Sequence, residues 1–305
     1  MKSETKNPLI CDPETGVCEI PVVAPNSQKI ETTAALMKPI RVIYYTDPIC
    51  SSCWGIEPQL RKLKLEYGHL LKFEYRMGGL LPDWSYNSGS ISKPEDVAQH
   101  WDEVSYYLQM PIDGDVWLED PLHSSYPPSI AFKAAQLQND QKALVFLRRL
   151  RELLFLEKKN ITKWKHVKQA ALYSQLDVNQ LKEDYLNGSA EKHFLEDLEL
   201  GRKLGIRAFP TIIFIDVDGN DQIVNGSKPY KDYELAIKNL LPISKKKIYD
   251  DSLYHLMTHY PSLTVKEYAE LSDKNIIIAK QILDALSSSN QLKKTVTKNG
   301  NLYSL

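Results

Sequence analysis

The 305-residue sequence is 43% hydrophobic and 25% charged, with a formal net charge of −1 at pH 7, as in an ordinary soluble globular protein. The length predicts one elaborated domain with a small appendage, and the near-neutral charge excludes bulk attraction to nucleic acid or to an anionic membrane. No window is long and apolar enough to span a bilayer, and residues 1–8 lack the apolar core of a secretory signal, so a cytoplasmic location is expected.

Residues 1–38 are rich in proline and poor in periodic pattern, which predicts an extended N-terminal arm. The arm contains Cys11 and Cys18, and the Pro- and Gly-containing interval between them permits a tight turn. We expect a second redox-active dithiol or a structural disulfide here. The alternatives are two exposed thiols without a function and a metal-binding site. A closed zinc site needs four ligands, however, and no histidine or further cysteine lies nearby in the sequence.

The run Asp-Pro-x-Cys-x-x-Cys-Trp-Gly at residues 47–55 is the strongest local pattern. A β-branched and aromatic run at 40–45 predicts a buried strand before it, and apolar residues spaced by three and four predict a helix after it. Cys50 and Cys53 are therefore expected at a strand-to-helix junction. Free N–H groups and the helix dipole favour an anion there, so Cys50 is predicted to ionise more easily than a free thiol and to attack a disulfide, and Cys53 to resolve the product.

Two neighbours of the cysteines have open roles. Trp54 either shields the sulfurs or simply packs in the core. Asp47 either accepts a proton from Cys53, if it is buried beside it, or is an ordinary turn residue before a proline. We expect no metal and no other cofactor, although four thiols in two pairs are also able to ligate one ion.

Strand patterns occur in three further places. Residues 71–77 alternate apolar and polar side chains and predict a strand parallel to the first one across the intervening helix. Residues 209–216 predict another strand, which forms a hairpin with a short strand at 222–224. A last amphipathic helix is predicted at 230–241.

The two remaining segments are mainly helical. Residues 93–204 predict an all-helical insert, in which Arg148, Arg149 and Arg151 are expected to face solvent. Residues 242–305 predict three helices and a terminal hairpin, as in a winged-helix module. This segment has a mild lysine surplus and no arginine, so a protein-docking or packing role is expected and nucleic-acid binding is not.

Three motifs in this order resemble the cytosolic branch of the DsbA family, the FrnE-like dithiol-disulfide isomerases, which are related to the SpxH (YjbH) protease adapters. They are the two-cysteine run, Gly-Gly-Leu-Leu-Pro at 78–82, and Gly-Ile-Arg-Ala-Phe-Pro-Thr at 205–211. The resemblance implies an α/β thioredoxin fold formed by residues 39–92 and 205–241 and interrupted by the helical insert. The arm and the C-terminal module lie outside it.

The resemblance also implies that Phe209-Pro210 is a cis peptide bond facing the cysteines, with Thr211 beside it. A proline opposite Cys50 leaves the neighbouring backbone groups free to hold an extended substrate strand. Ser51 and Ser52 replace the histidine of strongly oxidising relatives, which leaves the direction of electron flow open.

The function predicted from these features is a thiol-disulfide oxidoreductase or isomerase that acts on dithiols and disulfides of protein substrates. The alternative is an adapter or scaffold that delivers a client protein to a ClpXP-type protease, which follows from the resemblance alone. A membrane partner is not expected for either function.

Overall fold

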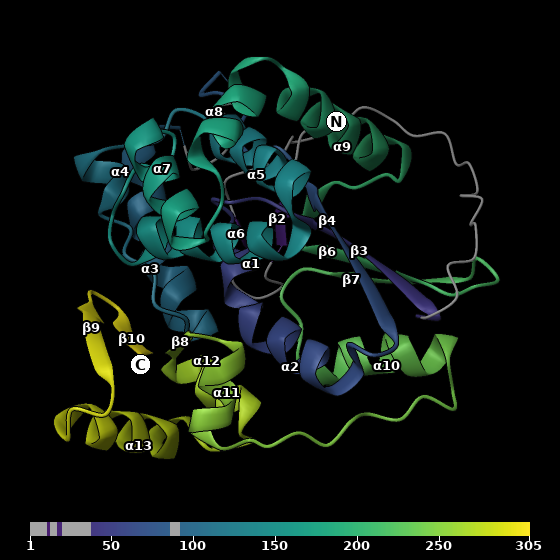
Figure 1. The fold of residues 1–305 in the computed structure, drawn as a ribbon, viewed down its shortest axis with the longest axis vertical. Coiled ribbons are helices and arrows are strands. Elements are labelled where there is room, and N and C mark those ends of the chain that lie inside the picture. Colours follow the sequence, from purple (N-terminus) through teal and green to yellow (C-terminus); the bar gives the residue numbers. More distant parts are fainter. Residues whose placement is uncertain (1–10, 13–16, 20–37, 86–91) are drawn as a thin grey trace, which may run out of the picture.

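The computed structural model describes residues 11–12, 17–19, 38–85 and 92–305 (Figure 1). Most of the arm predicted at 1–38 therefore lies outside the described residues. No helix in the described ranges has the length and apolar character needed to cross a membrane.

A mixed four-stranded sheet in the order β4-β3-β6-β7 forms the centre of the molecule. Its strands are β3 (Ile40–Thr46), β4 (Leu71–Met77), β6 (Thr211–Ile215) and β7 (Asp221–Asn225). β3 and β4 are parallel, as predicted, and β6 and β7 are antiparallel to their neighbours. A parallel pair needs a crossover connection, which is made by α1 (Ser51–Gly55) and α2 (Glu57–Tyr67).

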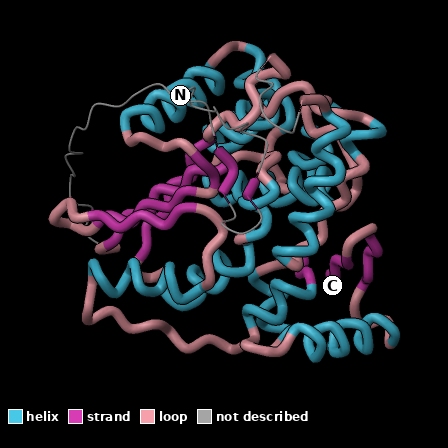
Figure 2. The backbone as a smooth tube through the Cα atoms, turned by 180° about the vertical axis from the view of Figure 1, so that it is seen from behind, coloured by secondary structure: helices cyan, strands magenta, loops and turns pink. Residues whose placement is uncertain are grey.

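Helices cover both faces of this sheet (Figures 1 and 2). α2 packs on one face together with α10 (Tyr230–Leu240). The helical insert lies on the other side and contains α3 (Pro94–Leu108), α4 (Val116–Glu119), α5 (Tyr126–Gln138), α6 (Asp140–Phe155), α7 (Trp164–Tyr173), α8 (Val178–Leu186) and α9 (Ser189–Lys203). Aromatic rings in contact tie the insert to α1: the ring centre of Trp54 lies 5.6 Å from that of Phe155 in a stacked arrangement, and the ring centre of Phe155 lies 4.8 Å from that of Trp101, which is tilted against it. The insert and the sheet therefore share one core.

The C-terminal module has its own core and docks against α2. It contains α11 (Leu253–His259), β8 (Ser262–Thr264), α12 (Val265–Leu271), α13 (Ile276–Ser288), β9 (Lys293–Thr297) and β10 (Gly300–Ser304). Its antiparallel sheet has the order β8-β10-β9. The three helices and the hairpin match the sequence prediction, but β8 was not predicted because three residues directly before a helix carry no strand period.

Two further predictions are corrected. The strand expected at 209–216 is divided by Pro210 into β5 (Ala208–Phe209) and β6, because proline has no N–H to give to a ladder. β5 pairs instead with β2 (Val17–Glu19), and β2 with β1 (Cys11–Asp12). The three arginines of α6 do not face solvent: Arg151 is fully buried, and the side chains of the other two are at most 15% exposed.

Candidate functional site

Cys50 and Cys53 lie at the junction where β3 leads into α1. Cys50 is the N-cap residue of α1, in an extended conformation, and its Sγ accepts a hydrogen bond from the Cys53 N–H at 3.1 Å. The sulfur thus takes the place that a Ser or Asp oxygen usually holds at a helix start. Neither cysteine is part of a disulfide.

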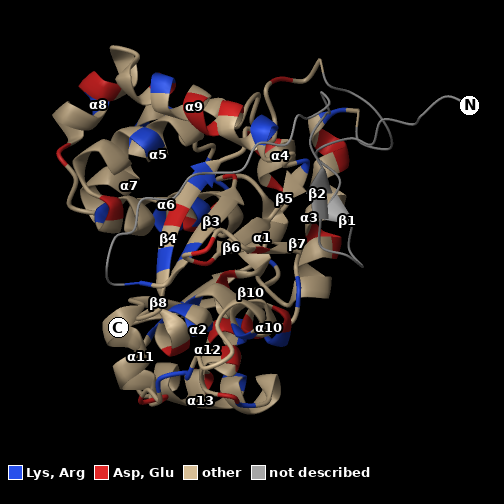
Figure 3. Ribbon diagram, turned by 90° about the vertical axis from the view of Figure 1, so that its right-hand side faces the viewer, with Lys and Arg blue, Asp and Glu red and all other residues tan. Residues whose placement is uncertain are grey.

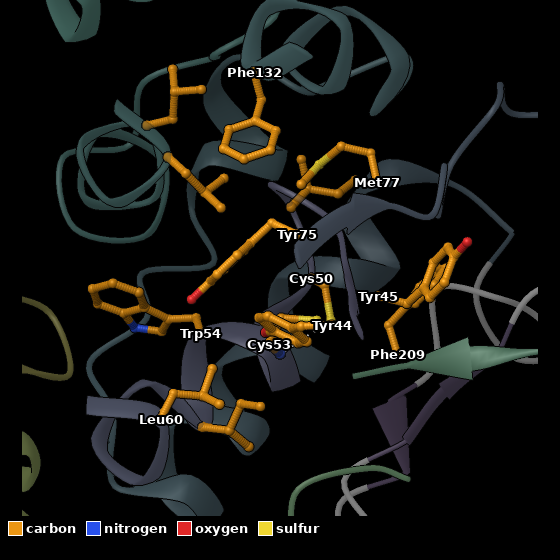
Figure 4. Close-up of a cluster of buried hydrophobic side chains, with 14 of the residues drawn as sticks. Tyr44, Tyr45, Cys50, Cys53, Trp54, Leu60, Tyr75, Met77, Phe132 and Phe209 are labelled. Carbon is orange, nitrogen blue, oxygen red and sulfur yellow. Dashed lines mark hydrogen bonds between the residues drawn. The ribbon is translucent and has the colours of Figure 1, made fainter. Parts of the chain in front are cut away.

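Neither cysteine is exposed to solvent. Both have 0% relative exposure, and Figure 4 shows them among the rings of Tyr44, Trp54 and Phe209. A protein disulfide must approach within bonding distance of a thiolate before exchange can start. In this conformation the surrounding side chains exclude such an approach.

The surroundings shift the pKa values of the two sulfurs in opposite directions. Burial raises the pKa of Cys50, and the hydrogen bond to the Cys53 sulfur raises it further. Burial also opposes ionisation of Cys53, but the hydrogen bond from Cys50 and the charge of Arg151 outweigh it and lower the pKa of Cys53. Within this pair the surroundings favour the thiolate on the inner sulfur over Cys50, and the attacking role predicted for Cys50 stays a prediction.

Arg151 is the cation responsible, and sequence reasoning missed it. Its Nη2 donates to Thr46 Oγ1 at 2.6 Å and to the Asp47 carbonyl oxygen at 3.2 Å, and its Nη1 donates to Glu57 Oε1 at 2.7 Å. Three arginines within four positions of an amphipathic helix are typical of a solvated face, so no local signal separates Arg151 from its neighbours. Its partners lie about a hundred residues earlier in the chain.

Asp47 is fully buried, and burial raises its pKa to about 6. Its Oδ1 accepts from the Ile49 N–H at 3.0 Å, and its Oδ2 accepts from the Leu80 N–H at 2.8 Å and from Ser125 Oγ at 2.9 Å. These bonds hold together the turn before the cysteines, the loop after β4 and the start of α5. A proton-accepting role toward Cys53 stays a prediction.

Trp54 is fully buried and is packed against a ring and a cation. Phe155 stacks on it at an interplanar angle of 25°, and the guanidinium carbon of Arg148 lies 4.3 Å from the ring centre. Its indole N–H donates to the Pro111 carbonyl oxygen at 3.0 Å. This geometry is that of a satisfied core tryptophan, with a cation on one face.

The peptide bond between Phe209 and Pro210 is cis, as the resemblance implied. Phe209 is fully buried, and Thr211 Oγ1 lies 2.7 Å from the Ala208 carbonyl oxygen. The backbone of Cys18 is paired with that of Phe209, and the backbone of Cys11 with that of Cys18. The structure thus brings the arm cysteines to the segment that carries the cis bond, and their role as a second redox pair stays a prediction.

A buried network of charges runs from the cysteines to the C-terminal module. Glu57 contacts Arg151 at 2.7 Å and Arg61 at 3.9 Å, and Arg61 lies 3.2 Å from Glu267. Glu267 is fully buried and belongs to α12. Among the described residues, no group of three or more His, Cys, Asp or Glu side chains is placed to hold a metal ion.

Residues 44–235 match a family model described as Thioredoxin. The chain is 33% identical over 303 residues to the ClpXP adapter protein SpxH of Halalkalibacterium halodurans, which covers 98% of this chain and 97% of the relative. The ClpXP adapter protein SpxH of Bacillus subtilis is 28% identical over 267 residues, covering 86% of this chain and 88% of the relative.

Two solved structures are also similar. A putative protein disulfide isomerase from Nitrosomonas europaea superimposes with a TM-score of 0.58 at 18% identity, covering 67% of this chain and 98% of its own. The cytosolic disulfide reductase DsbM from Pseudomonas aeruginosa gives a TM-score of 0.54 at 20% identity, covering 67% and 100%. At these identities the likeness concerns the fold alone. The predicted α/β thioredoxin fold with a large helical insertion and a small C-terminal module is confirmed.

The main functional prediction, a thiol-disulfide oxidoreductase or isomerase, is wrong. The curated relatives that match the chain over most of its length are named as adapters, which favours the alternative prediction. The two-cysteine motif misled the prediction because motif and position indicate a redox pair, whereas burial and the site of the negative charge depend on residues far away in the sequence.

Proposed function

Because this chain belongs to the thioredoxin family and to the family of the ClpXP adapter protein SpxH, we propose that it is an adapter that delivers a client protein to a ClpXP-type protease. The observation that carries the proposal is the extent of the similarity. The adapter relative from Halalkalibacterium halodurans spans 98% of the chain, whereas the two similar solved structures stop at 67%. About a third of the chain is thus shared with an adapter and not with those two structures.

The docking of the C-terminal module supports this role. Glu267 of the module is bound by arginines from α2 and α6, and Ser262 Oγ hydrogen-bonds to Glu152 of α6 at a short distance. Buried and paired charges hold the module in one orientation on the thioredoxin-like body. A fixed pair of bodies offers a surface to two partners at once, which an adapter requires.

Reconstitution tests the proposal. A client is first identified as a protein whose half-life lengthens in cells that lack either this chain or ClpX, with no further effect when both are absent. The purified client is then incubated with ClpX, ClpP and ATP, with and without the chain. We expect the chain to accelerate degradation, and a Cys50→Ser, Cys53→Ser double variant to accelerate it equally, because both sulfurs are buried.

Two outcomes would contradict the proposal. One is a client half-life that does not respond to the purified chain. The other is a folded double-serine variant that has lost all acceleration, which would make the thiols necessary. The adapter role requires the chain and the protease to share a compartment, which agrees with the expected cytoplasmic location.

A further inference from the structure

The outer edge of β4 carries backbone groups that the sheet does not use. Within the described ranges, no strand pairs with β4 on the side away from β3. The bonds from the Ile40 N–H to the Leu70 carbonyl and from the Gly78 N–H to the Thr46 carbonyl show that even-numbered residues face β3. The N–H and C=O groups of successive residues in a parallel strand point alternately to the two sides, so those of the odd-numbered residues point away from β3. The Met77 N–H shows this direction, because it donates to the Asp197 carboxylate and not to β3. The same alternation turns the N–H and C=O groups of residues 71, 73 and 75 outward.

A groove of about 730 Å³ follows this edge. The end of α2 forms one wall, with Lys64 and Gly68, and α5 and the start of α6 form the other, with Gln136 and Leu144. Figure 3 shows β4 at the outer edge of the sheet, with Lys and Arg residues at both ends. The groove is therefore open along an unpaired strand edge, which is a template for a further strand.

The groove is rich in cations that lack a carboxylate partner. Lys38, Lys64 and Lys72 line it, and none of the three forms an ion pair with another described residue. Of the two lining carboxylates, Glu74 is held by Arg41 at 2.8 Å and by Arg76 at 3.0 Å. The other lining carboxylate, Asp140, accepts from Gln136 Nε2 at 3.2 Å, and Lys64 Nζ donates to the Tyr75 hydroxyl at 2.6 Å. Three lysines without a carboxylate partner outweigh this one carboxylate, so the net charge of the groove is positive and attracts an acidic segment.

Two buried polar atoms in the walls also lack a partner. Arg76 Nε is an unused donor, and Gln136 Oε1 is an unused acceptor. A peptide group supplies one acceptor and one donor, which are the two groups needed here. Buried polar groups in proteins are usually hydrogen-bonded, so both atoms indicate a polar ligand beside β4.

We propose that the outer edge of β4 binds an extended, acidic segment of the client protein, which adds a strand to the central sheet. This inference rests on the proposed adapter function. Alternate side chains of an added strand point to opposite walls. Acidic residues of the segment therefore reach Lys64 on the α2 side and Lys72 on the other side, while backbone hydrogen bonds to β4 fix its register.

Fluorescence anisotropy with synthetic peptides tests the site on the full chain. The probe is a labelled peptide of about eight residues that alternates valine and glutamate, and its matched control alternates valine and lysine. We expect the acidic peptide to bind, and to bind more weakly as salt is added, while the basic peptide does not bind. Equal binding of both peptides, or of neither, would overturn the inference.

Variants locate the binding to the edge. A Lys38→Glu, Lys72→Glu double variant should weaken binding of the acidic peptide about tenfold, and Lys182→Glu, exposed on α8, should leave it unchanged. Phe73→Pro removes one outward N–H, and Phe73→Ala removes the same ring without removing the N–H. The proline variant should bind about fivefold more weakly than the alanine variant, whereas equal affinities would overturn strand addition.

The degradation assay separates this inference from the adapter proposal. If the wild-type chain and Lys182→Glu accelerate client degradation and the lysine double variant does not, the groove is the client site. If all three accelerate it equally, the inference fails and the adapter function stands. If the wild-type chain does not accelerate degradation, the adapter function is rejected, and so is the proposal that the groove binds the client. This holds regardless of the peptide-binding results.

Discussion

Arg148 of α6 and Glu267 of α12 form an ion pair, with 2.7 Å between Nη1 and Oε1, across 119 residues of sequence. The same guanidinium lies over Trp54, the residue next to Cys53. The second carboxylate oxygen of Glu267 accepts from the Thr264 N–H at 2.8 Å and so completes the capping box of α12. One side chain therefore both starts a helix of the C-terminal module and joins the module to the body.

We predict that Glu267→Gln lowers the free energy of unfolding by about 3–5 kcal/mol, because it leaves Arg61 and Arg148 buried without their carboxylate. Urea denaturation measures the change. The matched control is Glu270→Gln on the same helix, whose partner Lys266 is about a quarter exposed; it should cost about 0.5 kcal/mol or less. Equal losses for the two variants would show that the buried pair does not hold the module.

Stability should also respond to acid through Glu267. Burial alone would raise the pKa of Glu267, but the nearby Arg148 and Arg61 lower it. A carboxylate with a lowered pKa stabilises the fold fully above its unfolded pKa of about 4.3, and this contribution is lost as the pH falls toward the folded pKa. The stability gap between wild type and Glu267→Gln should therefore narrow below about pH 4. A gap that stays constant into the acid range would contradict this assignment.

Asp47 predicts a pH dependence of the opposite sign. Burial raises its pKa to about 6, from an ordinary value of about 3.9. Between these values the folded chain keeps a proton that the unfolded chain has released, so stability falls as the pH rises through this window, by about 2–3 kcal/mol. Asp47→Asn should flatten the curve between about pH 4 and 6, and Asp218→Asn, exposed in the β6–β7 turn, should not. A wild-type curve that is flat there would rule out the raised pKa.

We predict that Arg151→Met raises the pKa of Cys53, because the variant removes the cation that favours its thiolate. The ultraviolet absorbance of the thiolate as a function of pH measures the change, and a Cys53→Ser background assigns it to the inner sulfur. Arg149→Met, on the same helix but bound to Glu152 and Glu157, is the control and should leave the titration unchanged. If both variants titrate like the wild type, the charge on Cys53 has another cause.

Local sequence patterns predicted the structural features that depend on residues close together in the chain. The strand at 40–45, the helix-starting position of Cys50 and the capping box at Thr264 all follow from residues within a few positions. The environment of the sulfurs could not be predicted in this way. Arg151 reaches Glu57 across 94 residues, and the burial that raises the pKa of Cys50 comes from segments brought together only by the fold. The motif and its position at a helix start suggested an enzyme. Neither feature carries information on whether a substrate can reach the sulfur.

The close approach of Gly78 to Phe209 gives the last prediction. A Cβ on Gly78 would lie 1.8 Å from the end of the Phe209 ring, which is fully buried beside the cis peptide bond. Gly78→Ala should therefore cost about 1–3 kcal/mol, because the ring has to move within a packed core. Phe209→Leu alone should cost about 1–2 kcal/mol through the space it leaves.

The double variant decides whether this contact is the cause. Leucine is shorter than phenylalanine, so the space left by Phe209→Leu accepts the new methyl group of Gly78→Ala. We therefore expect the double variant to lose about 1 kcal/mol less unfolding free energy than the sum of the losses of the two single variants. Urea denaturation of the four chains completes the cycle. Strict additivity would mean that Gly78→Ala acts through the backbone, whose N–H bonds to the Thr46 carbonyl at 2.8 Å, and not through the ring.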